Sequence, residues 1–310
     1  MQSLWMLFAT FVFAIMGVCV KYASDDYSAA EIVAYRGAIS ALFILSLVQL
    51  RGGTFRTTLP WHHLWRGLVG VTALWLWFHS FNALPLPIVV TLNYTSSIWI
   101  AVILLGVRWW RGAKHGEWTL VGAILMSFIG VVLLLQPTVQ MDQWRSALLA
   151  LGSGFLAALA YLQVRKLGHM GEPEYRVVFY FSITSIVAGI LIVEAGALLN
   201  STGVSWHAHT PRGLALLLAI GVTGTVAQVA MTRAYRLGNV LVSANLQYMG
   251  IVFASISGIL LWDDQLGWLG WSGVALILVS GIASTFASAT KKPRSLPPRE
   301  PAADVIASEI

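Results

Sequence analysis

Long apolar runs recur along the whole chain and constrain its fold more than any other feature. Each run has about 20 residues, the length that an α-helix needs to cross the roughly 30 Å hydrocarbon layer of a bilayer. The 310 residues are 57% hydrophobic and only 10% charged, with a mean hydropathy of +0.75. In a soluble domain, about a quarter of all residues are normally charged. The sequence therefore predicts an all-α polytopic membrane protein.

Polar breaks divide the chain into ten predicted membrane spans. They cover approximately residues 3–21, 29–50, 64–84, 86–107, 117–136, 146–165, 175–198, 212–233, 239–262 and 267–288. The first run lacks the basic leader and the small-residue cleavage site of a signal peptide. We therefore expect it to be retained as the first transmembrane helix.

Lys and Arg are unevenly distributed between alternate connections, which sets the expected orientation. Fifteen, including Arg66, fall in one set of loops and the tail, whereas the other set holds only Lys21, Arg145 and Arg212. Because cytoplasmic loops carry the basic excess, we expect both termini in the cytoplasm and the chain in a bacterial inner membrane. This bias explains the net charge of +6 without a nucleic-acid partner. The Pro-rich tail, residues 290–310, is predicted to be disordered.

Catalytic and metal-binding signatures are absent from the sequence. There is no P-loop, no G-x-S-x-G and no H-E-x-x-H segment. The single cysteine, Cys19, allows neither a disulfide nor a multi-cysteine metal site within one chain. We predict a protein that is not an enzyme and needs no metal or cofactor. Its oligomeric state, monomer or homodimer, stays open.

The two halves of the chain share weak similarities in the same order. Thr91-Leu-Asn-Tyr94 matches Asn245-Leu-Gln-Tyr248 at an offset of 154, and two glycines of span 117–136 match two of span 267–288 at an offset of 151. Because each half holds five spans, the second half enters the membrane inverted. We predict two inverted five-helix repeats, residues 1–136 and 144–289, an architecture of secondary transporters. The alternative is a duplicated scaffold that transports nothing.

Several motifs resemble those of the EamA-type transporters of the drug/metabolite transporter superfamily. They are Glu31-Ile-Val-Ala-Tyr-Arg36, Ala234-Tyr-Arg-Leu-Gly238 and the Gly-rich spans 117–136 and 267–288. The chain departs from the family pattern at Leu105-Gly-Val-Arg108, where members often carry a Gly-Glu pair. The resemblance implies a small-molecule substrate, and we expect export of an amino acid or related zwitterionic or amphiphilic metabolite by alternating access. The alternatives are import of a nitrogenous cofactor or vitamin, and a membrane ligand sensor or scaffold.

Arg36 is the candidate residue that is most expensive to bury. It lies about eight residues into span 29–50, some 12 Å from the end of the helix at a rise of 1.5 Å per residue. A charge at this depth should face a cavity or pair inside the bundle. We expect its guanidinium to bind a substrate carboxylate or phosphate. The alternative is a fixed bridge to helix-end carbonyls or to Glu31.

Polar and aromatic side chains on other spans complete the predicted substrate site. The side chains on span 86–107 share one helical face, and the internal similarity pairs them with the side chains on span 239–262. A Trp and a His one turn apart on span 64–84 are expected to line the same cavity. The full set is Arg36, Trp75, His79, Thr91, Tyr94, Trp99, Asn245 and Tyr248. The alternative is that these groups only pack and hydrogen-bond between helices.

Two carboxylates near span ends, Glu31 and Glu194, are the candidates for proton coupling. A proton-driven cycle needs a titratable group along the transport path. Substrate exchange or facilitated diffusion would need no such group, and the sequence leaves these alternatives open.

Overall fold

The computed structural model describes residues 2–80, 84, 86–110, 112, 118–136, 143–198, 206–263 and 265–289. Within them it contains a short 3-10 helix, η1 (Gln2–Leu4), and the α-helices α1 (Trp5–Ala23), α2 (Ala29–Arg51), α3 (Pro60–Ser80), α4 (Leu86–Tyr94), α5 (Ser96–Trp110), α6 (Trp118–Leu135), α7 (Trp144–His169), α8 (Glu174–Leu198), α9 (Pro211–Leu237), α10 (Val240–Leu246), α11 (Met249–Trp262) and α12 (Trp268–Ala289). The predicted disordered tail, residues 290–310, lies outside the described residues.

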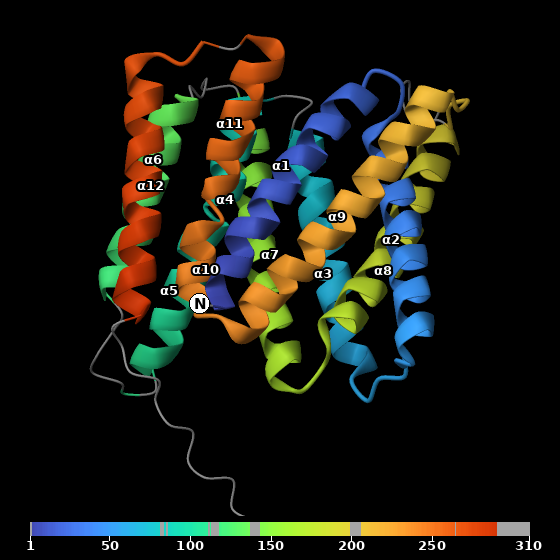
Figure 1. Cartoon of the computed structure of the whole chain (residues 1–310), viewed down its shortest axis with the longest axis horizontal. Coiled ribbons are helices and arrows are strands. Elements are labelled where there is room, and N and C mark those ends of the chain that lie inside the picture. The colour runs from blue at the N-terminus through green and yellow to red at the C-terminus, as the bar shows by residue number, and fades with distance from the viewer. Residues whose placement is uncertain are drawn as a thin grey trace, which may run out of the picture.

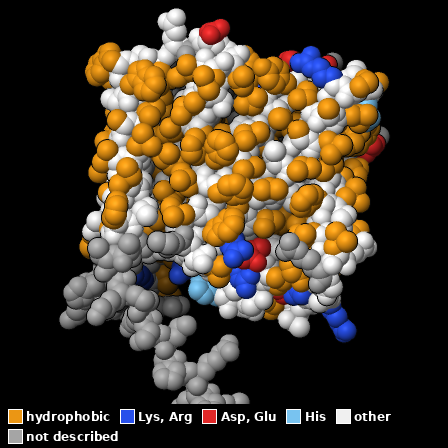
Figure 2. Space-filling model, viewed as in Figure 1, with side chains coloured by type: hydrophobic (Ala, Val, Ile, Leu, Met, Phe, Trp, Pro, Cys, Tyr) orange, Lys and Arg blue, Asp and Glu red, His pale blue; other side chains and the backbone are white. Residues whose placement is uncertain are grey.

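The described chain has nine segments that are long and apolar enough to cross a membrane. These segments include α4 with α5 and α10 with α11 as continuous units, whereas α3 is not among them. In the space-filling view, hydrophobic side chains cover the middle of the molecule and most charged side chains lie toward its two ends (Figure 2). The all-α, multi-pass membrane class expected from the sequence is confirmed.

The helices form a bundle whose members run roughly along one direction (Figure 1). α6 packs on α12 at one end of the molecule, and α2 packs on α8 at the other. Between these pairs, α1 packs on α9 and α3 packs on α7. Segments far apart in the sequence are therefore direct neighbours throughout the bundle.

Local capping explains several helix boundaries. Ser28 and Glu31 form a capping box at the start of α2, an arrangement that satisfies two backbone donors reciprocally. Thr210 caps α9, whose first residue is Pro211, and proline is favoured at this position because it has no N–H to satisfy. The predicted span boundaries agree with the helices to within a few residues at most ends.

Close packing joins α6 to α12. A Cβ atom added to Gly130 would lie 2.8 Å from the Gly273 carbonyl oxygen, so the two backbones touch where both residues lack side chains. The Ser127 and Ser280 hydroxyls lie 2.7 Å apart in the same interface. Small residues and interhelical hydrogen bonds drive helix association in lipid, where the hydrophobic effect between helices is weak.

Candidate functional site

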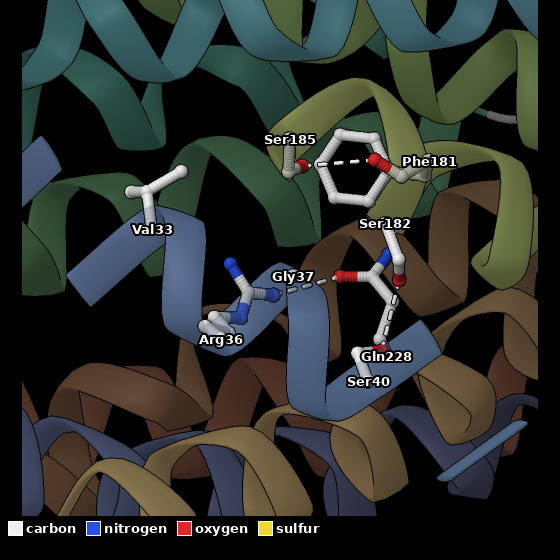
Figure 3. Close-up of a pocket in the computed structure, with 8 residues that line it drawn as sticks. All are labelled: Val33, Arg36, Gly37, Ser40, Phe181, Ser182, Ser185 and Gln228. Carbon is white, nitrogen blue, oxygen red and sulfur yellow. Dashed lines mark hydrogen bonds between the residues drawn. The ribbon is translucent and has the colours of Figure 1, made fainter. Parts of the chain in front are cut away.

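Arg36 lies on the eighth residue of α2 and reaches across to α9. Its Nη2 atom donates a hydrogen bond of 3.3 Å to Oε1 of Gln228. Both residues line a narrow pocket formed by α2, α8 and α9, together with Ser40, Ser182 and other residues (Figure 3). The pocket therefore joins a helix from the first half of the chain to two helices from the second half.

The Arg36 guanidinium has unused hydrogen-bonding capacity in this pocket. A guanidinium has five N–H donors, and the bond to Gln228 is its one hydrogen bond to another described residue. Among the pocket serines, Ser182 donates to the Ser40 hydroxyl and Ser185 donates to the Phe181 carbonyl; neither bond involves Arg36. The Glu31 carboxylate does not pair with Arg36 in this structure, because it bonds to the start of α2 and to His207. An anionic ligand is the natural partner for the remaining donors.

Tyrosines and a glutamine continue the polar interior next to this pocket. The Tyr235 hydroxyl donates to Gln247 Oε1 at 2.9 Å, and Gln247 Nε2 donates to the Tyr161 hydroxyl at 3.4 Å. The rings of Tyr161 and Tyr235 stack with centroids 5.2 Å apart. Tyr161 lies near Arg36, which places the tyrosine group beside the pocket.

Two spans are interrupted at corresponding places in the two halves of the chain. α4 ends at Tyr94 and α5 begins at Ser96, while α10 ends at Leu246 and α11 begins at Met249. The rings of Tyr94 and Tyr248, one at each break, stack with centroids 5.8 Å apart. Interrupted helices at equivalent positions are characteristic of substrate sites in transporters.

The structure groups some of the predicted site residues and separates others. Arg36 lines the pocket, and Tyr94 and Tyr248 pack in one cluster with Tyr161 and Tyr235. Thr91 is buried, and its hydroxyl has no hydrogen-bond partner among the described residues. Trp99 on α5 packs edge-on against Phe155.

Three predicted residues lie elsewhere. Asn245 is fully engaged with α12, because its amide donates to the Ser280 carbonyl and to the Ser284 hydroxyl. This bonding is the helix-joining role that the sequence left as the alternative. Trp75 and His79 stack on each other with centroids 5.4 Å apart, but both are exposed and Trp75 retains 46% of its accessible surface. The structure does not bring this pair to the polar interior.

Glu31 belongs to a cluster that ties the α8–α9 connection to the start of α2. It is completely buried, and its carboxylate accepts the backbone N–H of His207 at 2.7 Å and contacts the imidazole Nδ1 of the same residue at 2.7 Å. Nearby, Nε2 of His209 lies 2.9 Å from the Tyr35 hydroxyl. We call Ser28, Glu31, Tyr35, His207 and His209 the α2 latch. The other candidate carboxylate, Glu194, is exposed and accepts a hydrogen bond from Trp206.

A second cluster ties the α2–α3 connection to the start of α8, at the opposite end of the bundle (Figure 1). Glu172, which is 3% exposed, accepts hydrogen bonds from the Thr57 hydroxyl at 2.5 Å and from Arg176 Nη1 at 2.8 Å. Nε2 of His63 lies 3.4 Å from the same carboxylate. Burial alone would raise the pKa of the Glu172 carboxyl. The hydrogen bonds from Thr57 and Arg176 outweigh this effect and hold the pKa below its usual value. We call Thr57, His63, Glu172 and Arg176 the α8 latch.

Sequence reasoning missed three residues of the interior: Arg66, Tyr161 and Gln228. Arg66 was assigned to a cytoplasmic helix end because the span was expected to start at residue 64. The helix starts at Pro60, so Arg66 lies about 9 Å inside it and is buried. Pro60 was the available signal, because proline is favoured in the first turn of a helix. Gln228 was also detectable, as a polar residue in the middle of an apolar span.

The fold and the site together define a multi-pass helical membrane protein with a polar, arginine-containing interior. The EamA-like transporter family model matches residues 1–136 and again residues 144–286. The chain belongs to the EamA-like transporter family.

Curated relatives match along nearly the whole chain. The pseudopaline exporter CntI of Pseudomonas aeruginosa (strain UCBPP-PA14) is 31% identical, and the match covers 92% of this chain and 94% of the relative. A riboflavin transporter of Rhizobium johnstonii is 26% identical over 90% of this chain and 89% of the relative. A solved crystal structure matches with a TM-score of 0.77 at 16% identity, covering 92% of this chain and 98% of that one. This likeness shows a shared fold.

Proposed function

We propose that the protein is a secondary transporter that moves a small metabolite across the bacterial inner membrane by alternating access. Arg36 carries the proposal: it is a guanidinium deep in the bundle that bonds to Gln228 and keeps other donors free for a ligand. A fixed positive charge in a membrane interior is expensive and usually functional. The substrate is a zwitterionic or amphiphilic compound such as an amino acid, whose carboxylate pairs with Arg36.

The proposed topology has ten crossings, with both termini in the cytoplasm. The tenth is α3, which packs along α7 and α8 inside the bundle although its composition is more polar than that of the other spans. The basic excess in alternate connections supports the orientation.

Neighbouring helices support the proposal of two inverted repeats, residues 1–136 and 144–289. If the halves are exchanged, the pair α1 and α9 becomes the pair α7 and α3, and both pairs are in contact. Likewise α2 with α9 becomes α8 with α3, and these helices also touch. The pairs α2 with α8 and α6 with α12 are unchanged by the exchange. A bundle built from two equivalent halves has this property, and such halves can exchange roles between outward-open and inward-open states.

The two latches supply the gates that this cycle needs. Each holds the connection before one helix, α9 or α3, against the start of another, α2 or α8. Both are closed in this structure, on either end of a narrow pocket. We propose that one latch opens at a time. Glu31, inside the α2 latch, is the preferred site for proton coupling, ahead of Glu194.

Transport by purified protein in proteoliposomes tests the proposal. Labelled amino acids and related metabolites should be taken up or exchanged by the wild-type protein, and Arg36→Gln should lose this activity while keeping its melting temperature within a few degrees. Arg145→Gln, which removes an exposed arginine next to Trp144, is the matched control and should transport normally. Transport by Arg36→Gln at the wild-type rate would refute the proposed site.

Import of a nitrogenous cofactor or vitamin is the second candidate function. The relatives favour it in part, since they include a riboflavin transporter and, at 21% identity, an S-adenosylmethionine uptake transporter of Rickettsia bellii. We prefer export because the exporter from Pseudomonas is more similar to this chain than either of these. Adding riboflavin and S-adenosylmethionine to the labelled panel distinguishes the two candidates.

A further inference from the structure

Arg66 is a second buried guanidinium in the bundle, and it has no role in the function proposed above. It is only 3% exposed, and its Nε and Nη1 atoms have no hydrogen-bond partner among the described residues. Its guanidinium lies over the ring of Phe181, whose centroid is 4.2 Å from Cζ. Donors of a buried charged group that lack acceptors are costly, so this arginine is poised for a ligand.

Arg66 lies next to the Arg36 pocket. Phe181, over which Arg66 lies, is itself one of the residues that line this pocket (Figure 3). The two arginine side chains lie near each other, and Tyr161 lies near both. Two positive charges therefore converge on one polar interior from α2 and α3.

No carboxylate of the described chain lies among the middle turns of the bundle to neutralise these charges. Asp25, Asp26 and Asp263 lie at helix ends or in connections, and Glu31 and Glu172 are engaged in the latches. The remaining described acids are also near helix ends, where Glu174 pairs with Arg236 and Glu194 bonds to Trp206. The interior of this region therefore has an excess of two positive charges.

We propose that the substrate carries two separate anionic groups, one bound by Arg36 and the other by Arg66. This inference rests on the transport function proposed above and narrows its substrate class to metabolites that carry a second anionic group besides the one bound by Arg36. Guanidinium groups bind carboxylates and phosphates through paired hydrogen bonds. A doubly anionic ligand satisfies both arginines, whereas a singly anionic ligand leaves one of them unpaired in a low-dielectric interior.

Ligand-dependent melting of the purified, full-length protein tests this inference. The probes are α,ω-dicarboxylates of increasing length, from succinate to pimelate, each compared with the monocarboxylate of the same number of carbons. At least one dicarboxylate should bind the wild-type protein about tenfold more tightly than its monocarboxylate partner. Arg66→Gln should abolish this preference and leave weak monocarboxylate binding in place. Arg145→Gln should behave as the wild-type protein does.

Gly70→Ala provides a second variant in case Arg66→Gln does not fold. A Cβ atom at this position would collide with the Arg66 guanidinium, so the variant displaces the group without removing its charge and should also weaken the dicarboxylate preference. Equal affinity of the wild-type protein for every matched pair, or a preference that survives in Arg66→Gln, would overturn the proposal. If Arg36→Gln still abolishes metabolite transport in either case, the transport function stands and only the second anionic group is refuted.

Discussion

The two latches perform the same mechanical task with different chemistry. In the α8 latch, Glu172 pairs with Arg176 at 2.8 Å, and arginine keeps its charge at any physiological pH. In the α2 latch, Glu31 is held by His207, which is 42% exposed at its side chain. One end of the bundle is thus closed by a buried carboxylate that pairs with arginine, and the other by a buried carboxylate that pairs with a partly exposed histidine.

The two latches also face different compartments in the proposed orientation. The α2 latch faces outside the cell, and the α8 latch faces the cytoplasm. The buried group is a carboxylate in both latches. The latches differ in the side chain that binds this carboxylate, which is an arginine in one and a histidine in the other.

Glu172→Gln should have the largest effect on stability. It leaves Arg176 without its carboxylate and removes the charge next to buried His63, and breaking a buried ion pair costs about 3 kcal/mol. We expect a clear fall in the free energy of unfolding, measured by denaturant titration in detergent. Glu174→Gln is the control, because its pair with Arg236 is more exposed and should contribute less than about 1 kcal/mol. An equal fall in the free energy of unfolding in the two variants would show that the α8 latch contributes no more to stability than the Glu174–Arg236 pair does.

The contribution of the Glu172 charge should depend on pH in a defined window. Its pKa is lower in the folded protein than the reference value of 4.5. Stabilisation by this group is therefore complete above about pH 4.5 and is lost as the pH falls through the folded value. The difference in melting temperature between the wild-type protein and Glu172→Gln should be constant at neutral pH and shrink below about pH 4.5. A difference in melting temperature that widens on acidification would contradict the stabilising role of the ionised Glu172 carboxylate.

His207→Ala should have a smaller effect, confined to the α2 latch. The variant loses the imidazole contact with Glu31 but keeps the backbone hydrogen bond at 2.7 Å. Loss of one partly exposed hydrogen bond to a carboxylate costs about 1 kcal/mol. Hydrogen exchange of residues 206–213 should accelerate, with His169→Ala, which changes an exposed histidine at the end of α7, as the control. Unchanged exchange would mean that the backbone bond alone closes this end.

The sequence predicts the class of fold because the length of apolar runs and the charge asymmetry are local properties, and a bilayer selects membrane-spanning helices by such properties. It identifies Arg36 for the same reason, since a lone charge in an apolar span is visible without coordinates. The Arg66 assignment failed because a four-residue error in the start of one helix moves a side chain from the surface to the interior. The latches could not be found, because Glu31 and His207 are 176 residues apart in the chain and meet only through the packing of α2 against α9.

Faces of helices were also only partly predictable. Trp75 and His79 do share a face, as their spacing requires, and they stack. The neighbours of that face depend on the orientation of α3 about its own axis as it packs against α7 and α8. This orientation is set by long-range packing. Asn245 shows the same limit, since its position in the repeat matches that of Thr91 while its amide bonds to α12.

Alternating access requires that the pocket be reached through one latch at a time. Cysteine labelling can show this with Ser185→Cys, a buried pocket position, in a chain whose only native cysteine is removed by Cys19→Ser. A membrane-impermeant maleimide is applied to right-side-out or inside-out vesicles. Glu31→Gln should speed labelling of the thiol at position 185 only from the side of the α2 latch, and Glu172→Gln only from the opposite side. Labelling that rises equally from both sides in either variant, or that changes in neither, would contradict the account.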